Sequence, residues 1–159
     1  MLEPPLSRRT FEDRTRRLIA GDATLAEGEL AGWELGRDWL AWRLTQGEVG
    51  AARRRSPRLK MALSGHIAGT GGAFTEDLGF HGLSLRPLRP PRLGEGDEAS
   101  VRLTLAGRSI YLLGKVVWLG QGRLGVALGS AHPSDERALQ AAVCSGYLDR
   151  FPDEGQARP

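Results

Sequence analysis

From about residue 59 onward, the chain consists of short strand-like runs separated by glycine or proline. The clearest run is Val101, Leu103 and Leu105, which alternate with Arg102 and Thr104. Strict alternation of apolar and polar residues is typical of a strand with one face on a core. Five or six such runs, followed by a helix, predict a mainly β fold, namely a small antiparallel β-barrel closed by a C-terminal helix.

The other expected strands are less regular, and glycine-containing turns separate them. Pro87, Pro90 and Pro91 form a stretch that cannot belong to a central strand, because proline has no backbone donor. We expect strands at residues 61–68, 73–78, 82–85, 101–105, 110–118 and 124–128, with turns at 71–72, 94–97, 106–109 and 120–122.

Helical patterns are expected at both ends of the chain. Thr10-Phe-Glu-Asp13 resembles a capping box that opens a short helix through Ile19, and Gly21 would end it. Residues 39–44 fit a second short amphipathic segment, and residues 133–147 fit the terminal helix. Trp33, Trp39 and Trp42 are expected to pack against the barrel. The expected organisation is therefore a helical extension (1–50), a barrel domain (51–150) and a flexible tail (151–159).

Composition sets the class of protein. A chain of 159 residues with 40% apolar and 26% charged residues fits one globular domain. A single cysteine, Cys144, excludes an internal disulfide framework and agrees with a reducing compartment. No run is long enough to cross a bilayer and no secretory leader is visible, so we expect a cytoplasmic protein. The net charge of +3 is too small to imply broad nucleic-acid binding.

An arginine-rich run precedes the first expected strand. It contains Arg53, Arg54 and Arg58, and Pro57 disfavours helix for the residue before it. In an extended chain Arg54 and Arg58 lie on the order of 13 Å apart, so they can hold different parts of one ligand. The guanidinium fork pairs with phosphate oxygens or with the O6/N7 edge of guanine.

An acidic and glycine-rich turn follows, Asp77-Leu-Gly-Phe-His-Gly82. The Asp77 carboxylate can accept hydrogen bonds from the N–H groups on one edge of guanine. Gly79 and Gly82 permit positive φ and a close approach of backbone to a flat ligand. Arginines for phosphate and an acid for the base together indicate a site for a guanine nucleotide.

These residues resemble the pattern of the PilZ domain family of bacterial cyclic di-GMP receptors. Arg54-x-x-x-Arg58 matches the family's RxxxR segment, and Asp77 to Gly82 matches [D/N]xSxxG except that Gly79 replaces serine. Residues 113–118 and 124–128 look like the family's last two strands. The resemblance covers about residues 53–150. It implies that both arginines hold phosphate and guanine, while Asp77 and position 79 hydrogen-bond a base.

The resemblance implies a receptor that binds cyclic di-GMP and signals to an unidentified protein partner. Ordering of the Arg53–Arg58 segment over the ligand would carry the signal. Loss of the serine hydroxyl removes one hydrogen bond, which lowers affinity by roughly threefold to tenfold. The candidate ligand-binding residues are Arg53, Arg54, Arg58, Asp77, Gly79 and Gly82.

Other interpretations stay open. A degenerate PilZ-like adaptor would bind no nucleotide and act by protein contact, and Gly79 favours it. The arginine run could be a solvated linker, and the Asp77 segment a plain structural turn. A barrel that binds single-stranded nucleic acid would need exposed aromatic residues. Residues 61–128 offer only Phe74, Phe80, Tyr111 and Trp118.

No catalytic or metal-binding pattern is visible in the sequence. The histidines lack ligand spacing with one another or with Cys144. Residues 69–72 lack the lysine of a phosphate-binding NTPase loop. We therefore expect neither an enzyme nor a metal or other cofactor. Cys144 and Trp118 are interpreted as core residues, and the three histidines are His66, His81 and His132.

Overall fold

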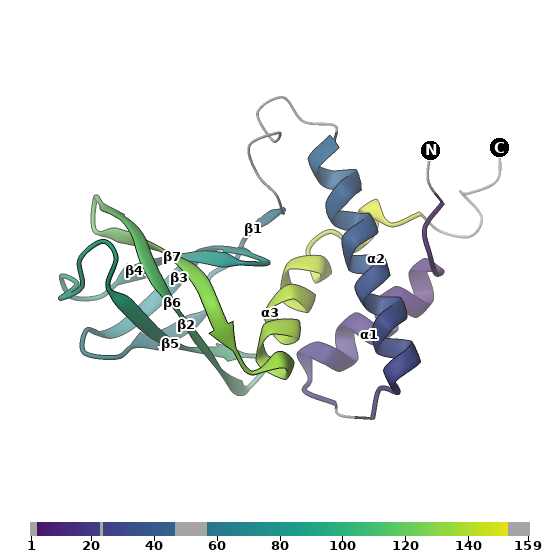
Figure 1. Ribbon diagram of the computed structural model, residues 1–159, viewed down its shortest axis with the longest axis horizontal. Helices are drawn as coiled ribbons and strands as arrows, with labels where there is room; N and C mark the ends of the chain where they lie inside the picture. The colour runs from purple at the N-terminus through teal and green to yellow at the C-terminus, as the bar shows by residue number, and fades with distance from the viewer. Residues whose placement is uncertain (1–2, 23, 47–56, 153–159) are drawn as a thin grey trace.

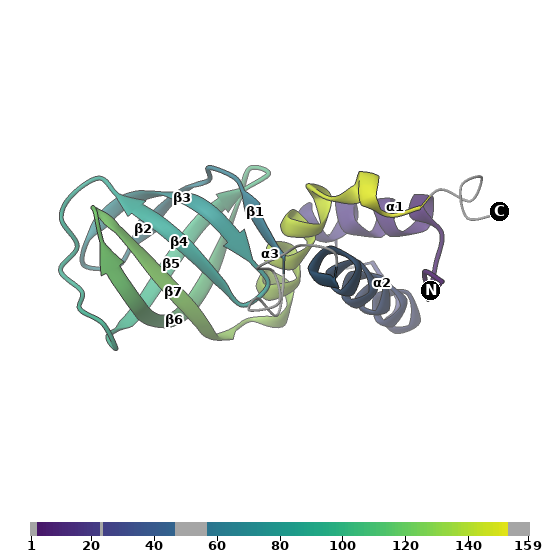
Figure 2. The same cartoon turned by 90° about the horizontal axis from the view of Figure 1, so that it is seen from above.

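The computed structural model describes residues 3–22, 24–46 and 57–152. A β-barrel occupies one end of the molecule and a cluster of helices the other, with α3 beside the barrel (Figures 1 and 2). The strands are β1 (Arg58–Lys60), β2 (Ser64–Ile67), β3 (Gly71–Gly79), β4 (Gly82–Pro87), β5 (Glu98–Leu105), β6 (Arg108–Gly120) and β7 (Arg123–Ala131). The helices are α1 (Arg8–Ile19), α2 (Glu27–Gln46), α3 (Pro133–Ser145) and a short 3-10 turn, η2 (Leu148–Arg150).

The strands form one antiparallel sheet in the order β1-β3-β2-β5-β6-β7-β4. An additional β3–β4 pairing closes β3, β2, β5, β6, β7 and β4 into a barrel. The short strand β1 pairs with the end of β3, beyond the part that pairs with β2. This architecture confirms the predicted mainly β fold with a closing C-terminal helix and helices at the N-terminal side.

The strand expected at 61–68 is shorter than predicted, because only Ser64–Ile67 (β2) is strand and residues 61–63 separate it from β1. Thr75 of β3 is buried at this interruption. Its hydroxyl accepts from the Leu63 N–H at 2.7 Å and donates to the Met61 carbonyl at 2.6 Å. The Thr75 side chain therefore provides hydrogen-bond partners for backbone groups that have no partner strand between β1 and β2.

The barrel interior follows the predicted alternation along β5. Val101, Leu103 and Leu105 are buried, while the intervening residues are exposed. The expectation for Trp118 was wrong, since its side chain is 40% exposed. A register shift between Val116 and Trp118 turns the strand at this point, and the indole lies over Gly125 of β7 instead of in the core.

The N-terminal helices are longer and begin earlier than expected. The N-cap of α1 is Ser7, whose side chain accepts from the Thr10 N–H, and not Thr10. The helix ends after Ile19 as predicted, and Gly21 has φ +76°. Helix α2 spans 20 residues instead of the short segment at 39–44. Gly36 is needed there, because a Cβ would lie 2.6 Å from the Phe11 ring.

Aromatic side chains hold the helices together. Phe11 stacks on Phe151 with ring centroids 4.6 Å apart and on Trp33 at 6.1 Å. Trp39 also meets Phe151, at 4.9 Å. Trp33 and Trp39 thus pack among the helices, whereas Trp42 is 38% exposed. Phe151 itself is fully buried.

Helix α3 connects the two parts of the molecule. Its residues from Ala138 to Cys144 are all buried. Arg108, at the start of β6, donates from Nε to the Ile19 carbonyl at 3.2 Å and lies 3.8 Å from the Asp135 carboxylate. Burial raises the pKa of the Cys144 thiol, which agrees with its interpretation as a core residue. Within the described ranges, no helix has the length and apolar character needed to cross a membrane.

Candidate functional site

Arg58 and Asp77 meet where β1 pairs with the end of β3. The register places Arg58 opposite Gly79, which makes Asp77 its diagonal cross-strand neighbour. Arg58 Nη1 donates to Asp77 Oδ1 at 2.9 Å. The two side chains are 39% and 35% exposed, so the ion pair lies at the surface. A ligand can therefore reach both groups.

A β-bulge directs Asp77 to the outside of the barrel. Thr75 pairs with Leu85 and Asp77 with Ser84, so Glu76 is an extra residue in β3. Thr75 and Leu78 are both buried, three residues apart, with the two acids between them on the outer side. Uninterrupted alternation would direct Asp77 inward with Thr75. The bulge thus makes the Arg58–Asp77 pair possible.

Two buried glycines, Gly79 and Gly82, lie beneath the Arg58 side chain. A Cβ at Gly79 would lie 3.4 Å from Arg58 Cδ and Nε, and one at Gly82 would lie 3.6 Å from Arg58 Nη2. Neither glycine is among those with positive φ, so their role here is to allow close packing and not that conformation. Gly82 is required for another reason, since a Cβ would lie 2.9 Å from the Val126 carbonyl oxygen.

The Asp77–Gly82 segment was expected to be a turn, but most of it belongs to strands. Asp77 and Gly79 lie in β3, and Gly82 begins β4. Only Phe80 and His81 connect them, and Phe80 is 4% exposed. The buried ring fixes the hairpin to the core, so the neighbouring acid and glycines are held on a rigid element.

The structure brings together four of the six predicted ligand-binding residues. These are Arg58, Asp77, Gly79 and Gly82. Arg53 and Arg54 lie outside the described residues, so their place at the site stays a prediction. Pro57 is buried and directly precedes β1, which fixes the point from which the preceding residues extend.

A neighbouring ion cluster has a structural role. Glu76 accepts from Arg86 Nε and Arg123 Nη1, both at 2.7 Å. The hydrogen bonds from Arg123 and then Arg86 hold the pKa of the Glu76 carboxyl below its ordinary value. This acid is thus bound by two arginines from neighbouring strands, whereas Asp77 has Arg58 alone among the described residues.

A family model for the PilZ domain matches residues 52–144, which is more than half of the chain. The chain belongs to the PilZ domain family. PilZ domains are receptor and adaptor domains, and the family is one of cyclic di-GMP receptors. The matched range contains the barrel, the arginine run and the Asp77 hairpin.

Solved structures with the PilZ fold resemble the chain at low identity. The inhibitor of motility (MotI/DgrA) of Bacillus subtilis matches with TM-score 0.55 and 14% identity, over 62% of this chain and 52% of that one. The chain therefore spans about half the length of that protein. The likeness supports the fold alone. No curated protein sequence matches the chain.

Two further PilZ structures also match. One is the PilZ domain of CeSA from a cellulose-synthesizing bacterium, with TM-score 0.48 and 21% identity over 58% of this chain and 99% of that one. The other is the PilZ domain of YcgR from Escherichia coli with c-di-GMP, with TM-score 0.49 and 19% identity over 62% of this chain and 92% of that one.

Tyr147 contacts Arg58, which the sequence did not reveal. Its hydroxyl donates to the Arg58 carbonyl from just beyond the end of α3. A Cβ at the adjacent Gly146 would lie 2.4 Å from Leu59, so β1 and the end of α3 are closely packed. Tyr147 and Arg58 are 89 positions apart in the sequence, and only the closed barrel brings them together.

The described residues offer no metal centre. No three of the His, Cys, Asp and Glu side chains within the described ranges are grouped so that they could hold an ion. The chemistry available at the site is instead that of a guanidinium donor and a carboxylate acceptor, with two buried glycines beneath the guanidinium group. Such a set can bind a ligand that has both an anionic group and an N–H-bearing edge.

Proposed function

We propose that this PilZ protein is a receptor that binds cyclic di-GMP at the surface formed by Arg58, Asp77, Gly79 and Gly82. The observation that supports it most is the meeting of these four residues at one rigid hairpin, although they are spread over 25 positions of the sequence. Each half of the pattern occurs often by chance. Their assembly on adjacent strands is what a receptor requires.

The proposed roles follow from the donor and acceptor chemistry. Arg58 pairs with a phosphate oxygen or with the O6/N7 edge of guanine, and Asp77 accepts from guanine N–H groups. Arg53 and Arg54 add further contacts, since a four-residue extended segment reaches about 13 Å from Arg58. Binding exchanges the Arg58–Asp77 ion pair for contacts with the ligand, so each partner keeps a hydrogen bond.

The contact between Tyr147 and β1 suggests how the signal reaches a protein partner. Tyr147 joins the Arg58 backbone to the end of α3, and α3 packs against α1 and α2. A ligand that moves the Arg53–Arg58 segment thereby changes the packing of β1 on the helices. A ligand can shift the balance between two arrangements of β1 on the helices only if it binds one of them more tightly than the other.

Calorimetric titration of the purified protein with cyclic di-GMP, with GTP as the control, tests the proposal. We expect saturable binding at micromolar concentration or tighter, equivalent to about −8 kcal/mol, and much weaker binding of GTP. Absence of binding up to about a millimolar in folded protein would contradict the receptor function and favour the adaptor, which acts by protein contact alone.

Replacing Gly79 with serine should strengthen cyclic di-GMP binding by roughly threefold to tenfold, because the hydroxyl adds one hydrogen bond. The new Cβ would lie 3.2 Å from the Gly82 carbonyl oxygen and 3.4 Å from the flexible Arg58 side chain, so small shifts accommodate it. Gly79→Ala is the matched control, since it adds the Cβ without the hydroxyl. Equal affinities of the two variants would contradict a role for a hydroxyl at this position.

A further inference from the structure

A polar cavity lies at the end of β3 opposite to Asp77. Its volume is about 670 Å³, and it opens between the β2–β3 turn and the segment that follows β4. Strand β3 begins at Gly71, beside this cavity, and reaches Asp77 six residues later, which is roughly 20 Å along the strand. The cavity is therefore separate from the Arg58–Asp77 surface, and an inference from it does not rest on the proposed function.

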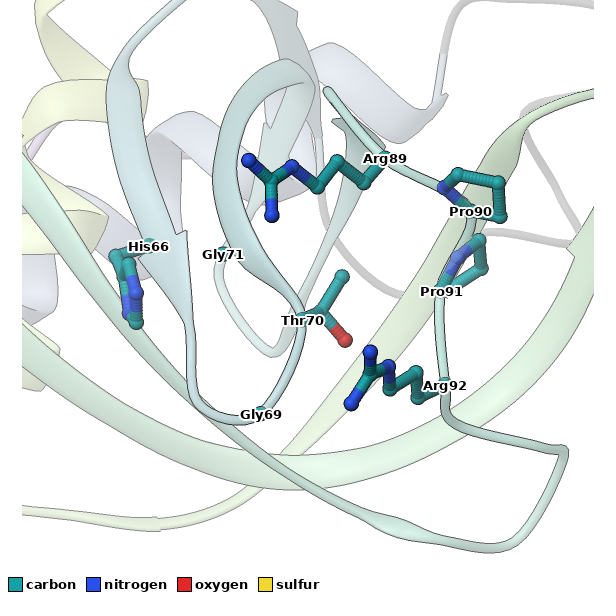
Figure 3. A pocket seen from close by; sticks show the side chains of 8 residues that line it. All are labelled: His66, Gly69, Thr70, Gly71, Arg89, Pro90, Pro91 and Arg92. Atoms are coloured by element: carbon teal, nitrogen blue, oxygen red, sulfur yellow. The ribbon is translucent and has the colours of Figure 1, made fainter.

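Two arginines are directed into this cavity. Figure 3 shows Arg89 and Arg92 extending into it on either side of Pro90 and Pro91, with His66 across from them. Neither arginine has an ion-pair partner among the described residues, and none of the eight residues that line the cavity is acidic. Two uncompensated positive charges on one concave surface favour an anion.

Thr70 supplies an independent indication of a ligand. Its Oγ1 is inaccessible to solvent and has no hydrogen-bond partner within the described part of the chain. A buried hydroxyl without a partner is costly, and native structures seldom leave one unexplained. Figure 3 shows this oxygen on the side of Thr70 that faces Arg92. Rotation of the Thr70 side chain toward the cavity would let the hydroxyl donate to a bound anion.

We propose that this pocket binds a phosphate-bearing small molecule of about nucleotide size. A tetrahedral phosphate offers oxygens in several directions, so it can accept from guanidinium groups and a hydroxyl that approach from different sides, which a planar carboxylate does less well. The pyrrolidine rings of Pro90 and Pro91 form an apolar wall for the rest of the molecule. The cavity volume falls within the range of about 300–1,000 Å³ that is common for small-molecule sites.

Calorimetric titration with inorganic triphosphate in roughly 0.15 M salt, where long-range attraction is largely screened, tests the site. The wild-type protein should bind it saturably, and Arg89→Gln/Arg92→Gln should bind at least tenfold more weakly. Arg9→Gln is the control for lost charge, since Arg9 is exposed on α1. Absence of saturable binding to the wild-type protein, or equal binding by the double variant, would overturn the proposal.

Thr70→Val tests the buried hydroxyl. The variant should bind triphosphate about threefold to tenfold more weakly. Its thermal stability should not fall, because the hydroxyl that it loses has no hydrogen-bond partner among the described residues. Unchanged affinity would overturn the assigned contact with Thr70.

Three comparisons define the ligand class. Citrate should bind more weakly than triphosphate, and equal affinity would overturn the assignment to phosphate. ATP should bind more tightly than inorganic triphosphate, and equal affinity would overturn the nucleotide size. Saturating cyclic di-GMP should leave triphosphate binding by the wild-type protein unchanged, whereas competition between the two would overturn the assignment to a separate site.

Discussion

Phe11→Ala should lower the free energy of unfolding by about 3–5 kcal/mol, the range for removing a buried aromatic ring. Phe11 is fully buried and stacks on both Phe151 and Trp33, so three segments lose contacts together. The cavity would open at the centre of the helical cluster, next to Gly36 of α2. Denaturant unfolding followed by circular dichroism measures this change.

Leu35→Ala is the matched control for this variant. Leu35 is also apolar but 60% exposed on α2, so its loss should change stability by no more than about 0.5 kcal/mol. If Phe11→Ala were as mild as Leu35→Ala, the helices would not form a packed core. A large loss would instead show that residues 1–50 contribute to the stability of the domain.

Arg58→Ala should weaken cyclic di-GMP binding by at least about 1.5 kcal/mol, or roughly tenfold or more, the range for hydrogen bonds to charged groups. Its effect on stability should be small, because an exposed ion pair contributes only about 0–1 kcal/mol. Calorimetric titration and thermal unfolding of the same sample separate the two effects.

Arg86→Ala controls for the loss of an ion-paired arginine. Arg86 pairs with Glu76, the residue next to Asp77, so the variant removes a similar charge from a neighbouring strand. It should leave cyclic di-GMP affinity nearly unchanged. Equal losses in both variants would indicate a general charge effect and would contradict a specific site at Arg58.

The sequence was sufficient for the barrel where the pattern of residues was local. Alternation predicts β5, glycine-rich turns predict the β5–β6 and β6–β7 hairpins, and Pro133 with acids in the first turn predicts α3. It was insufficient where a strand is irregular. The break between β1 and β2 depends on Thr75, and the exposure of Trp118 depends on a register shift. Neither feature leaves a periodic pattern in the sequence.

The candidate site shows the same division. The residue types and spacing of Arg58, Asp77, Gly79 and Gly82 indicate a guanidinium donor and a carboxylate acceptor beside two glycines. Only the folded chain decided that Asp77 faces outward, because a bulge at Glu76 reverses the alternation of β3. The pairing with Arg58, the bond from Tyr147 and the pocket between residues 66 and 92 depend equally on strand register.

The sequence by itself thus determined the mainly β class, the terminal helix and the set of residues proposed to bind a guanine nucleotide. These features depend on local periodicity and on side-chain chemistry, which the order of residues states directly. Tertiary structure alone decided the closure of the barrel by β3 and β4, the direction of Asp77 and the contacts of α1 with α3. Such features arise from pairing between distant segments, and pairing is set by packing of the whole chain.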